Sequence, residues 1–367
     1  MDKYKPKVVS ITLTQNCNLA CTYCYEHNKS LQVMNFNTAK SIIDKEFSTL
    51  KDDEYIEFDL FGGEPFLEFE LLKRITEYVC EVKGNNQCQL FATTNGTLVH
   101  GEIQEWLRNH RCFVCGLSLD GTREMHNINR SNSYDDIDLD FFIDLYPKQD
   151  VKMTISKETL PNLAEGVIEL HKKGFLVSCN LAYQIDWSAS ENVFILYREL
   201  QKLIDFYLDN PEIVPCSMLE MGFSNVAAYA DEAIKFCGAG TTMRSYDVDG
   251  KFYTCHFFMP LSVGKEKAED ARKIEFPKET IPNELLDKKC VDCIIKSVCP
   301  NCFGANYAAT GNIYSRDDNM CKLTKITLKA RSYFRAKQWE QGQLKGTNEE
   351  IQAILKSIVK IQEELKV

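Results

Sequence analysis

The chain has 367 residues and a formal net charge of −10, because 53 acidic residues outnumber 43 lysines and arginines. An acidic chain repels phosphate, so this composition argues against nucleic acid as the main partner. Sixteen cysteines, an N-terminus without an apolar leader and the absence of any run as long as a membrane span argue against a secreted disulfide framework and against a membrane protein. We therefore expect a cytoplasmic protein whose clustered cysteines bind metal.

The first two hundred residues alternate short β-rich runs with amphipathic helical runs. Strands are predicted at 8–13, 55–61, 89–93, 113–119, 151–156 and 175–183, and helices at 37–50, 68–82, 102–109, 136–146, 161–173 and 192–208. Repeated β-then-α order implies a parallel sheet with right-handed crossovers. Six such units predict an α/β fold, a partial (β/α)6 TIM-like barrel in residues 1–225, with its chemistry at the C-terminal ends of the strands.

The rest of the chain changes character twice. Residues 226–325 form a predicted cysteine-rich module, because 237–321 hold seven cysteines and show little helical periodicity; metal ligation would hold such a segment together. Residues 326–367 are a predicted helical extension. Thr347 and Glu350 fit a capping box, and apolar residues then recur at helical spacing, at Ile351, Ile354, Leu355, Ile358 and Leu365. We expect this last helix to pack on the protein body; gripping a partner peptide is the alternative.

Three cysteines follow the first predicted strand. Cys17, Cys21 and Cys24 have the spacing C-x3-C-x2-C. Three thiolates on a short loop can ligate three irons of a four-iron cluster and leave the fourth iron open to a small molecule. A zinc loop is the alternative, with His27 as its fourth ligand.

Other polar motifs follow the next predicted strands. The run Gly62-Gly63-Glu64-Pro65 ends the second strand, where two glycines let the backbone approach a ligand and one carboxylate can hold an ammonium group. Asn95 follows the third strand, and Ser118 and Asp120 follow the fourth. All of these residues belong to one edge of the predicted sheet.

The cysteine loop, followed one β–α unit later by Gly-Gly-Glu-Pro, resembles the radical S-adenosylmethionine (radical SAM) enzymes. The resemblance implies that the open iron binds S-adenosylmethionine, whose cleavage yields a 5′-deoxyadenosyl radical. It places Tyr23 near the adenine and the residues of the glycine motif at the amino group. It places Ser118 at polar groups of the cofactor and makes Arg130 a candidate for the carboxylate. The implied cofactor-binding set is Tyr23, Gly62, Gly63, Glu64, Asn95, Ser118 and Arg130, with Asn95 and Asp120 either facing the site or shaping turns.

The later cysteines resemble the SPASM extension, which carries two auxiliary four-iron clusters. The seven positions are Cys237, Cys255, Cys290, Cys293, Cys299, Cys302 and Cys321. The resemblance implies one cluster on Cys290, Cys293, Cys299 and Cys321, and three ligands to another from Cys237, Cys255 and Cys302. Three four-iron clusters are thus expected in total. Two zinc knuckles are the alternative.

This chain departs from the SPASM pattern at three points. Only two residues separate Cys299 from Cys302, where three are usual. No cysteine directly precedes Cys237, so Asp231, Cys216 or an open iron would complete its cluster. Where sulfatase maturases have an aspartate after the second SPASM cysteine, this chain has His256. A histidine can serve as a base near pH 7, so His256 is the candidate catalytic residue; a hydrogen bond to cluster sulfur is the alternative.

The run 301–312 resembles maturases of ribosomally made peptides that carry spaced cysteine repeats. The resemblance implies that a cysteine-containing precursor peptide is the substrate and that thioether links from sulfur to carbon are the product. An electron donor such as flavodoxin or ferredoxin is the implied partner. The barrel is predicted to begin near residue 8, so a separate leader-binding protein or the C-terminal helices would hold the peptide leader.

Several alternatives stay open at this point. Within enzymes they are carbon–carbon cross-linking, epimerisation and sulfatase-type oxidation. In another class, the chain is a non-catalytic iron–sulfur or zinc protein that carries electrons or scaffolds a partner. Of the six cysteines outside both sets, Cys216 has a possible site role. The other five are expected to be buried core thiols: Cys80, Cys88, Cys112, Cys115 and Cys179.

Overall fold

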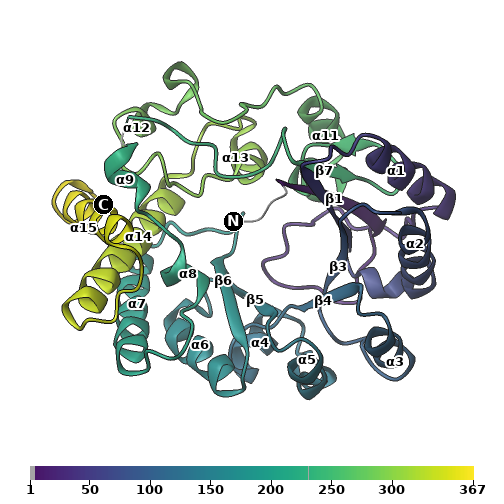
Figure 1. Cartoon of the computed structure of the whole chain (residues 1–367), viewed down its shortest axis with the longest axis horizontal. Coiled ribbons are helices and arrows are strands. Elements are labelled where there is room, and N and C mark those ends of the chain that lie inside the picture. Colours follow the sequence, from purple (N-terminus) through teal and green to yellow (C-terminus); the bar gives the residue numbers. More distant parts are fainter. Residues whose placement is uncertain (1–4, 230) are drawn as a thin grey trace. The chain divides into compact units, whose positions relative to one another are not determined.

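The computed structural model describes residues 5–229 and 231–367 and shows a mixed α/β fold with helices at its C-terminal end (Figure 1). The strands are β1 Lys5–Thr14, β2 Glu54–Gly62, β3 Cys88–Thr94, β4 Phe113–Leu117, β5 Asp150–Ile155, β6 Leu176–Leu181, β7 Met243–Tyr246 and β8 Phe252–Tyr253. The longer helices are α1 Phe36–Ser48, α2 Phe69–Val82, α3 Glu102–Asn109, α5 Leu139–Leu145, α6 Leu163–Lys172, α7 Glu191–Asp209, α13 Phe303–Thr310, α14 Asp318–Glu340 and α15 Asn348–Glu364. The predicted α/β fold class is confirmed.

Short helices lie between these elements. They are α4 Arg123–Asn129, α8 Ser217–Glu220, α9 Asn225–Ala228, α10 Pro260–Val263, α11 Lys265–Ala271 and α12 Lys288–Val291, with single 3-10 turns at Pro65–Glu68, Tyr134–Asp136, Leu160–Asn162, His256–Phe258 and Asn283–Leu285. No helix within residues 5–229 and 231–367 combines the length and the apolarity that a membrane crossing requires.

All six predicted strands are present, and they belong to two sheets. The larger sheet has the order β4-β3-β2-β1-β7-β8, and β5 pairs with β6 in a separate two-stranded sheet. β1, β2, β3 and β4 are parallel neighbours, as the repeated β–α order predicts. β7 adds to the free side of β1 in parallel, and β8 turns back antiparallel to β7.

The contacts divide the described residues into two compact units. Unit 1 contains residues 5–119, 130–151 and 238–276, and unit 2 contains 120–129, 152–237 and 277–367. The larger sheet and the first cysteine loop belong to unit 1. Of the seven later cysteines, Cys255 belongs to unit 1 and the other six belong to unit 2. The predicted three-way division into 1–225, 226–325 and 326–367 stays a prediction.

The two faces of β2 have different surroundings. Ile56, Phe58 and Leu60 are fully buried on one face, where the Phe58 ring lies 5.4 Å from the Phe47 ring of α1. Because side chains alternate along a strand, Asp59 and Phe61 lie on the opposite face. There the Phe61 ring stacks on His256 at 5.0 Å. The helix-covered face is therefore the core of unit 1, and the opposite face is turned toward the loops that carry the chemistry.

A buried ion pair joins β1 to α1. Lys7 Nζ lies 2.8 Å from Glu46 Oε2, and both side chains are buried. The hydroxyl of Tyr246 in β7 donates a short hydrogen bond to the same carboxylate. Arg244 Nε lies 3.5 Å from Glu46 Oε2. One carboxylate thus connects α1 to two neighbouring strands of the larger sheet, β1 and β7.

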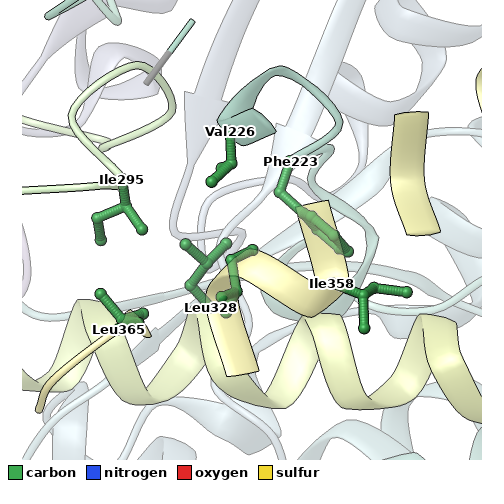
Figure 2. Packing of buried hydrophobic residues seen from close by; sticks show 7 residues of the cluster. Phe223, Val226, Ile295, Leu328, Ile358 and Leu365 are labelled. Carbon is green, nitrogen blue, oxygen red and sulfur yellow. The ribbon is translucent and has the colours of Figure 1, made fainter. Parts of the chain in front are cut away.

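The last helix packs as the sequence predicts. Thr347 and Glu350 form both hydrogen bonds of a capping box at the start of α15. Figure 2 shows Ile358 of this helix and Leu365, which directly follows it, beside Leu328 of α14 and Phe223, Val226 and Ile295. Ser357 Oγ also donates to Ser224 O at 2.9 Å. The apolar stripe of α15 therefore completes a core of unit 2, and the predicted packing on the body is confirmed.

Candidate functional site

The first cysteine loop leaves the C-terminal end of β1, where its three thiols share one cation. Burial by itself would lower the pKa of the Lys29 ammonium, but Cys24, Cys17 and Cys21 together with Glu26 raise it. Lys29 Nζ is held by Leu19 O at 3.1 Å. Burial raises the pKa of the Cys17 and Cys24 thiols, and the charge of Lys29 lowers it in part. Lys29 thus acts in favour of the thiolate, which is the form that ligates metal.

The two glycines after β2 let this strand press against the cysteine loop. A Cβ atom on Gly62, whose φ is +153°, would lie 2.4 Å from Thr14 O, and one on Gly63 would lie 2.3 Å from Asn16 O. In their place, Gly63 N donates to Thr14 O at 3.1 Å and Glu64 N donates to Asn16 O at 2.9 Å. The sequence predicts that these glycines let the backbone approach a ligand; in the structure they also bring two loops of the site together.

Glu64 is the buried centre of the edge formed by β2 and β3. Its Oε1 accepts from Thr94 Oγ1 at 2.8 Å and from Phe66 N at 3.1 Å, and its Oε2 accepts from Asn95 N at 2.8 Å. Burial raises the pKa of Glu64 to about 7, although these hydrogen bonds and the nearby Arg130 lower it. A carboxylate oxygen has two acceptor positions, so Glu64 retains capacity for one further donor, such as an ammonium group.

Asn95 ties β3 to the cysteine loop. Its Nδ2 donates to Asn18 Oδ1 at 2.8 Å, and its Oδ1 accepts from Thr97 N at 3.0 Å. Asn18 Nδ2 donates in turn to Thr97 Oγ1 at 2.8 Å. These hydrogen bonds occupy the Asn95 side chain, so within unit 1 this residue shapes the loops of the site.

Arg130 lies among the predicted cofactor residues of unit 1. Its guanidinium carbon is 5.4 Å from the centre of the Tyr23 ring, its side chain is buried, and its charge acts on Glu64. Ser131 and Asn132 follow it with φ of 56° and 57°, a conformation that side chains other than glycine adopt at a cost. Ser131 Oγ accepts from Ala20 N at 3.0 Å. This contact with the cysteine loop was missed, and the turn-prone pair Ser131-Asn132 was its only signal.

Ser118 and Asp120 sit at the end of β4 and belong to different units. Ser118 is buried, and its N donates to Thr94 O at 2.8 Å. Asp120, in unit 2, accepts from Thr154 N at 2.8 Å and from Asn129 Nδ2 at 3.1 Å. Asp120 is thus hydrogen-bonded to β5 and α4, which fits the turn-shaping alternative.

His256 lies in an aromatic cluster of unit 1. Its ring is 5.0 Å from Phe61, 5.4 Å from Phe257 and 5.8 Å from Tyr25. Burial lowers the pKa of His256 to about 4, so the imidazole is neutral at pH 7 and does not titrate there. Its Nδ1 is buried and has no hydrogen-bond partner among residues 5–229 and 231–367.

Asp59 was not singled out by sequence analysis. It lies two residues before Phe61 on the same face of β2, and its Oδ2 accepts from Ser10 Oγ at 3.1 Å. Burial and the neighbouring Glu57 raise the pKa of Asp59 to about 7, while the Ser10 hydrogen bond lowers it. Asp59 also raises the pKa of Tyr25. A polar residue in a β-strand that alternates with Phe58 and Leu60 was the available signal.

Four of the later thiols line one cavity in unit 2. Its volume is about 30 Å³, and the thiols are Cys290, Cys293, Cys299 and Cys321. Burial raises the pKa of Cys290, and the other three thiols raise it further. These are the four cysteines that the resemblance assigns to one auxiliary cluster.

Arg316 lines the same cavity as the four thiols and places a positive charge beside them. Its Nη1 donates a short hydrogen bond to Cys299 Sγ, and its Nη2 donates to Thr324 Oγ1 at 2.9 Å. Burial would lower the pKa of Arg316, but the thiols of Cys299, Cys321 and Cys290 raise it. Arg316 therefore plays the part for this set that Lys29 plays for the first.

A larger cavity of about 500 Å³ in unit 2 adjoins Cys302 and is also lined by Arg316. Burial raises the pKa of Cys302 to about 11, and Cys237 adds to the shift. These two thiols are therefore neighbours. Cys255, assigned with them by the resemblance, belongs to unit 1, so this second three-thiol set stays a prediction.

Cys216 and Asp231 are the two candidates for the fourth ligand of this set, and their surroundings differ. Cys216 is fully buried in unit 2, and its pKa is lowered by hydrogen bonds from Cys179 and Tyr207. These contacts join Cys216 to β6 and α7. Asp231 is exposed.

The prediction of five buried core thiols is wrong for part of the set. Cys115 and Cys179 are fully buried as expected, but Cys80 and Cys112 are exposed and Cys88 is partly exposed. The cause is position: Cys80 lies in the last turn of α2, Cys88 begins β3, and Cys112 precedes β4. All three lie at the rim of the core.

The thiol sets fit a four-iron cluster better than a single zinc ion. Within residues 5–229 and 231–367, no three His, Cys, Asp or Glu side chains are close enough to share one metal ion. One zinc holds its sulfurs at about 2.3 Å, whereas a four-iron cluster spreads its cysteines around a cubane. Four thiols around a cavity, with an arginine beside them, match the second arrangement.

Comparison with known proteins agrees with these motifs. Residues 7–134 match the family model described as a 4Fe-4S single cluster domain. The cysteine-type anaerobic sulfatase-maturating enzyme of Clostridium perfringens is 29% identical over 174 residues, which cover 43% of this chain and 45% of that protein. The AdoMet-dependent heme synthase of Methanosarcina barkeri is 26% identical over 353 residues, or 86% of this chain and 96% of that protein.

The fold is shared over a longer stretch than the sulfatase-maturase sequence match. The solved structure of native anSMEcpe with bound AdoMet and a peptide superposes with a TM-score of 0.70 at 17% identity, covering 92% of this chain and 99% of that one. By sequence, the chain matches under half of the length of the sulfatase-maturating relative. The chain therefore shares the fold of that sulfatase-maturating enzyme over nearly its whole length, and its N-terminal third matches a four-iron cluster domain.

Proposed function

We propose that this protein is a radical SAM peptide maturase that forms thioether links in a cysteine-containing precursor peptide. The observation that carries the proposal is the close packing of the three-cysteine loop on Gly63 and Glu64, where Glu64 N donates to Asn16 O at 2.9 Å, beside an edge organised by Glu64. When bound, S-adenosylmethionine and three four-iron clusters would supply the radical that removes a hydrogen atom and the route by which the remaining electron leaves.

The chain's own residues would hold the cofactor in the following way. Cys17, Cys21 and Cys24 would hold the first cluster, and Glu64 would accept a hydrogen bond from the ammonium group. Arg130 would pair with the carboxylate, and Tyr23, which contacts Arg130, would lie near the adenine. Gly62 and Gly63 act by letting this edge close on the cysteine loop.

His256 would take the proton of the substrate thiol. Its imidazole is neutral at pH 7, since burial lowers its pKa to about 4, and its Nδ1 is free of hydrogen bonds within the described chain. A neutral imidazole can accept a proton, but a general base works best when its pKa lies near the operating pH, so the lowered pKa makes His256 a weak base for this step. The thiolate then bonds to the carbon that has lost hydrogen.

The match to the heme synthase favours a second candidate, a step of heme synthesis with an iron porphyrin as the substrate or product. That match covers 96% of the relative, more than twice the share found for the sulfatase-maturating enzyme. A porphyrin and a peptide are chemically distinct substrates, so one experiment separates the two functions.

The test uses the full chain, reconstituted with iron and sulfide, together with a reductant and S-adenosylmethionine. A cysteine-rich precursor peptide should lose two hydrogens per link and should keep that mass after thiol reduction. The matched control is Cys24→Ser, which should stop release of 5′-deoxyadenosine. An unchanged peptide together with an altered iron porphyrin would establish the second candidate, and absence of 5′-deoxyadenosine with either substrate would leave only the electron-carrier alternative.

The same assay distinguishes the other possible products and tests the proposed partners. Epimerisation would leave the mass unchanged and would introduce deuterium from heavy water. Sulfatase-type oxidation would remove the cysteine sulfur. A flavodoxin or ferredoxin is the proposed electron donor and a separate protein the proposed leader-binding partner; each should raise turnover when added to the assay.

A further inference from the structure

Two exposed thiols outside the cofactor site lie against each other. Cys80 Sγ is 3.4 Å from Cys112 Sγ, and both residues are exposed. Cys80 is on the last turn of α2, and Cys112 lies between α3 and β4. The two residues are 32 positions apart in the sequence, so the chain fold brings them together.

The pair lies near the N-terminal ends of β3 and β4, whereas the cofactor motifs follow the C-terminal ends of the strands. Residue pairing sets Leu90 of β3 beside Phe113 of β4, so Cys112 lies just before the start of β4. Cys88 is the first residue of β3. Glu64 and Asn95 follow the other ends of β2 and β3. The proposed function therefore assigns no role to these thiols.

A third thiol, Cys88, lies near the pair. Cys88 is close enough to Cys80 and Cys112 for their charges to raise the pKa of its thiol. Nevertheless, no three potential ligands in the described part of the chain are grouped tightly enough for one ion. What remains is a dithiol whose sulfurs need to approach by only about 1.3 Å to reach disulfide bond length.

We propose that Cys80 and Cys112 form a thiol-modification site that takes low-molecular-weight disulfides, such as oxidised glutathione, and becomes an intramolecular disulfide. One protein thiol loses its proton and attacks a sulfur of the small disulfide, which forms a mixed disulfide and releases one small thiolate. The second protein thiol then attacks the first protein sulfur and releases the other small thiol. Two electrons pass from the protein to the small disulfide, and the two protons end on the two small thiols.

The surroundings of Cys80 determine the rate of this thiol–disulfide exchange. Burial, the hydrogen bond with Cys112 and the charge of Cys112 raise the pKa of Cys80 to about 11, while Lys83 lowers it. The thiolate is the attacking form. The exchange should therefore be slow at neutral pH and faster at higher pH, unlike that of a catalytic dithiol.

Closure would have a structural consequence within unit 1. The link would tie the end of α2 to the loop that enters β4, across a segment that contains β3 and α3. A cross-link over such a loop removes conformational freedom from the unfolded chain. The oxidised protein should therefore unfold at a higher temperature than the reduced protein.

The test treats the full-length holoprotein with oxidised glutathione under anaerobic conditions, blocks free thiols with N-ethylmaleimide and maps the peptides by mass spectrometry. A peptide pair joined through Cys80 and Cys112 is expected in the wild type and in Cys88→Ser. It should be absent in Cys80→Ser and Cys112→Ser, and dithiothreitol should reverse it together with the gain in thermal midpoint. Glutathione adducts without the cross-link, or a link from Cys80 to Cys88 in its place, would overturn the proposal.

Failure of this experiment leaves the proposed function untouched. The two thiols lie at the opposite strand ends from Glu64, so Cys80→Ser should release 5′-deoxyadenosine at the wild-type rate. A fall of that rate in Cys80→Ser would contradict the separation of the two sites.

Discussion

At the scale of single residues, Asp59 places a titratable carboxyl group on the face of β2 that is opposite the helix-covered core. Its pKa is raised to about 7 by burial and by Glu57, against about 4 in an unfolded chain. The folded protein therefore keeps this proton longer than the unfolded one does. The free energy of unfolding should fall as pH rises from about 4 to 7, because ionisation is costlier in the folded state.

We expect Asp59→Asn to flatten that dependence, since an amide does not titrate. The side chain is partly exposed, so solvent screening reduces the effect to about 2 kcal/mol at pH 8. Urea unfolding at a series of pH values measures it. The exposed Asp52→Asn serves as a control and should keep the wild-type slope; an unchanged slope in Asp59→Asn as well would show that this carboxyl titrates normally.

Arg316 is expected to set the reduction potential of the four-cysteine cluster. It is buried and donates to Cys299 Sγ, and a nearby buried cation stabilises the more negative, reduced form. Arg316→Met should lower the potential by about 60 mV or more, which corresponds to a tenfold change in the ratio of oxidised to reduced cluster.

Redox titration followed by electron paramagnetic resonance measures that change. Arg316→Lys keeps the charge and should recover part of the potential, while Arg335→Met, which removes an ion pair to Glu220, should leave it unchanged. Equal potentials in wild type and Arg316→Met would show that this arginine has only a structural role.

The residues of the first site could be predicted from sequence in type, but not in all their contacts. The cysteine spacing and the Gly-Gly-Glu-Pro run are local patterns, and they indicated the chemistry. Position 63 must be glycine because Asn16 O leaves no room for a Cβ atom, and these two residues are 47 positions apart in the sequence. The low basicity of His256 depends on rings from Tyr25 and Phe61. Such contacts leave no periodic signal in the sequence.

At the scale of elements, the buried carboxylate of Glu46 joins β1, α1 and β7. Removal of this group would leave Lys7 buried without its counter-ion, and an unpaired buried charge is costly. We expect Glu46→Ala to lower the free energy of unfolding by about 3 kcal/mol, measured by urea denaturation. The double variant Lys7→Met/Glu46→Leu removes both charges and should recover most of the loss; if it is no more stable than Glu46→Ala, the pair does not account for the effect.

The elements that sequence predicts are the long, periodic ones. All six strands of the predicted barrel are present, and the capping box starts α15 at the predicted place. β7 and β8 were missed because four and two residues are too few for an alternating pattern. α4 was missed for the same reason, and the helix predicted at 136–146 begins only at Leu139, after its N-cap Asp138.

At the scale of the whole molecule, the two units depend on different kinds of stabilisation. Unit 1 has the larger sheet and its buried strand residues, such as Val9, Ile11 and Leu13. In unit 2, α14 and α15 share an apolar core. Between residues 277 and 302 the helices are single turns. A segment with so little regular structure would depend on the cluster proposed for its four cysteines to stay folded.

We therefore expect Cys290→Ser/Cys293→Ser to open this segment while β1 to β4 stay closed. If the proposed cluster is present, loss of two of its ligands removes the attachment of α12 and the following loop, and a local opening needs less free energy than global unfolding. Amide hydrogen exchange read by mass spectrometry should speed up by at least tenfold within 277–321 and remain at the wild-type rate in Val9–Leu13. The matched control Cys80→Ser/Cys112→Ser also replaces two thiols and should change neither region. Uniformly faster exchange along the chain would show that the four-cysteine set stabilises the protein as one cooperative body, and unchanged exchange in 277–321 would show that this segment holds its fold without a cluster.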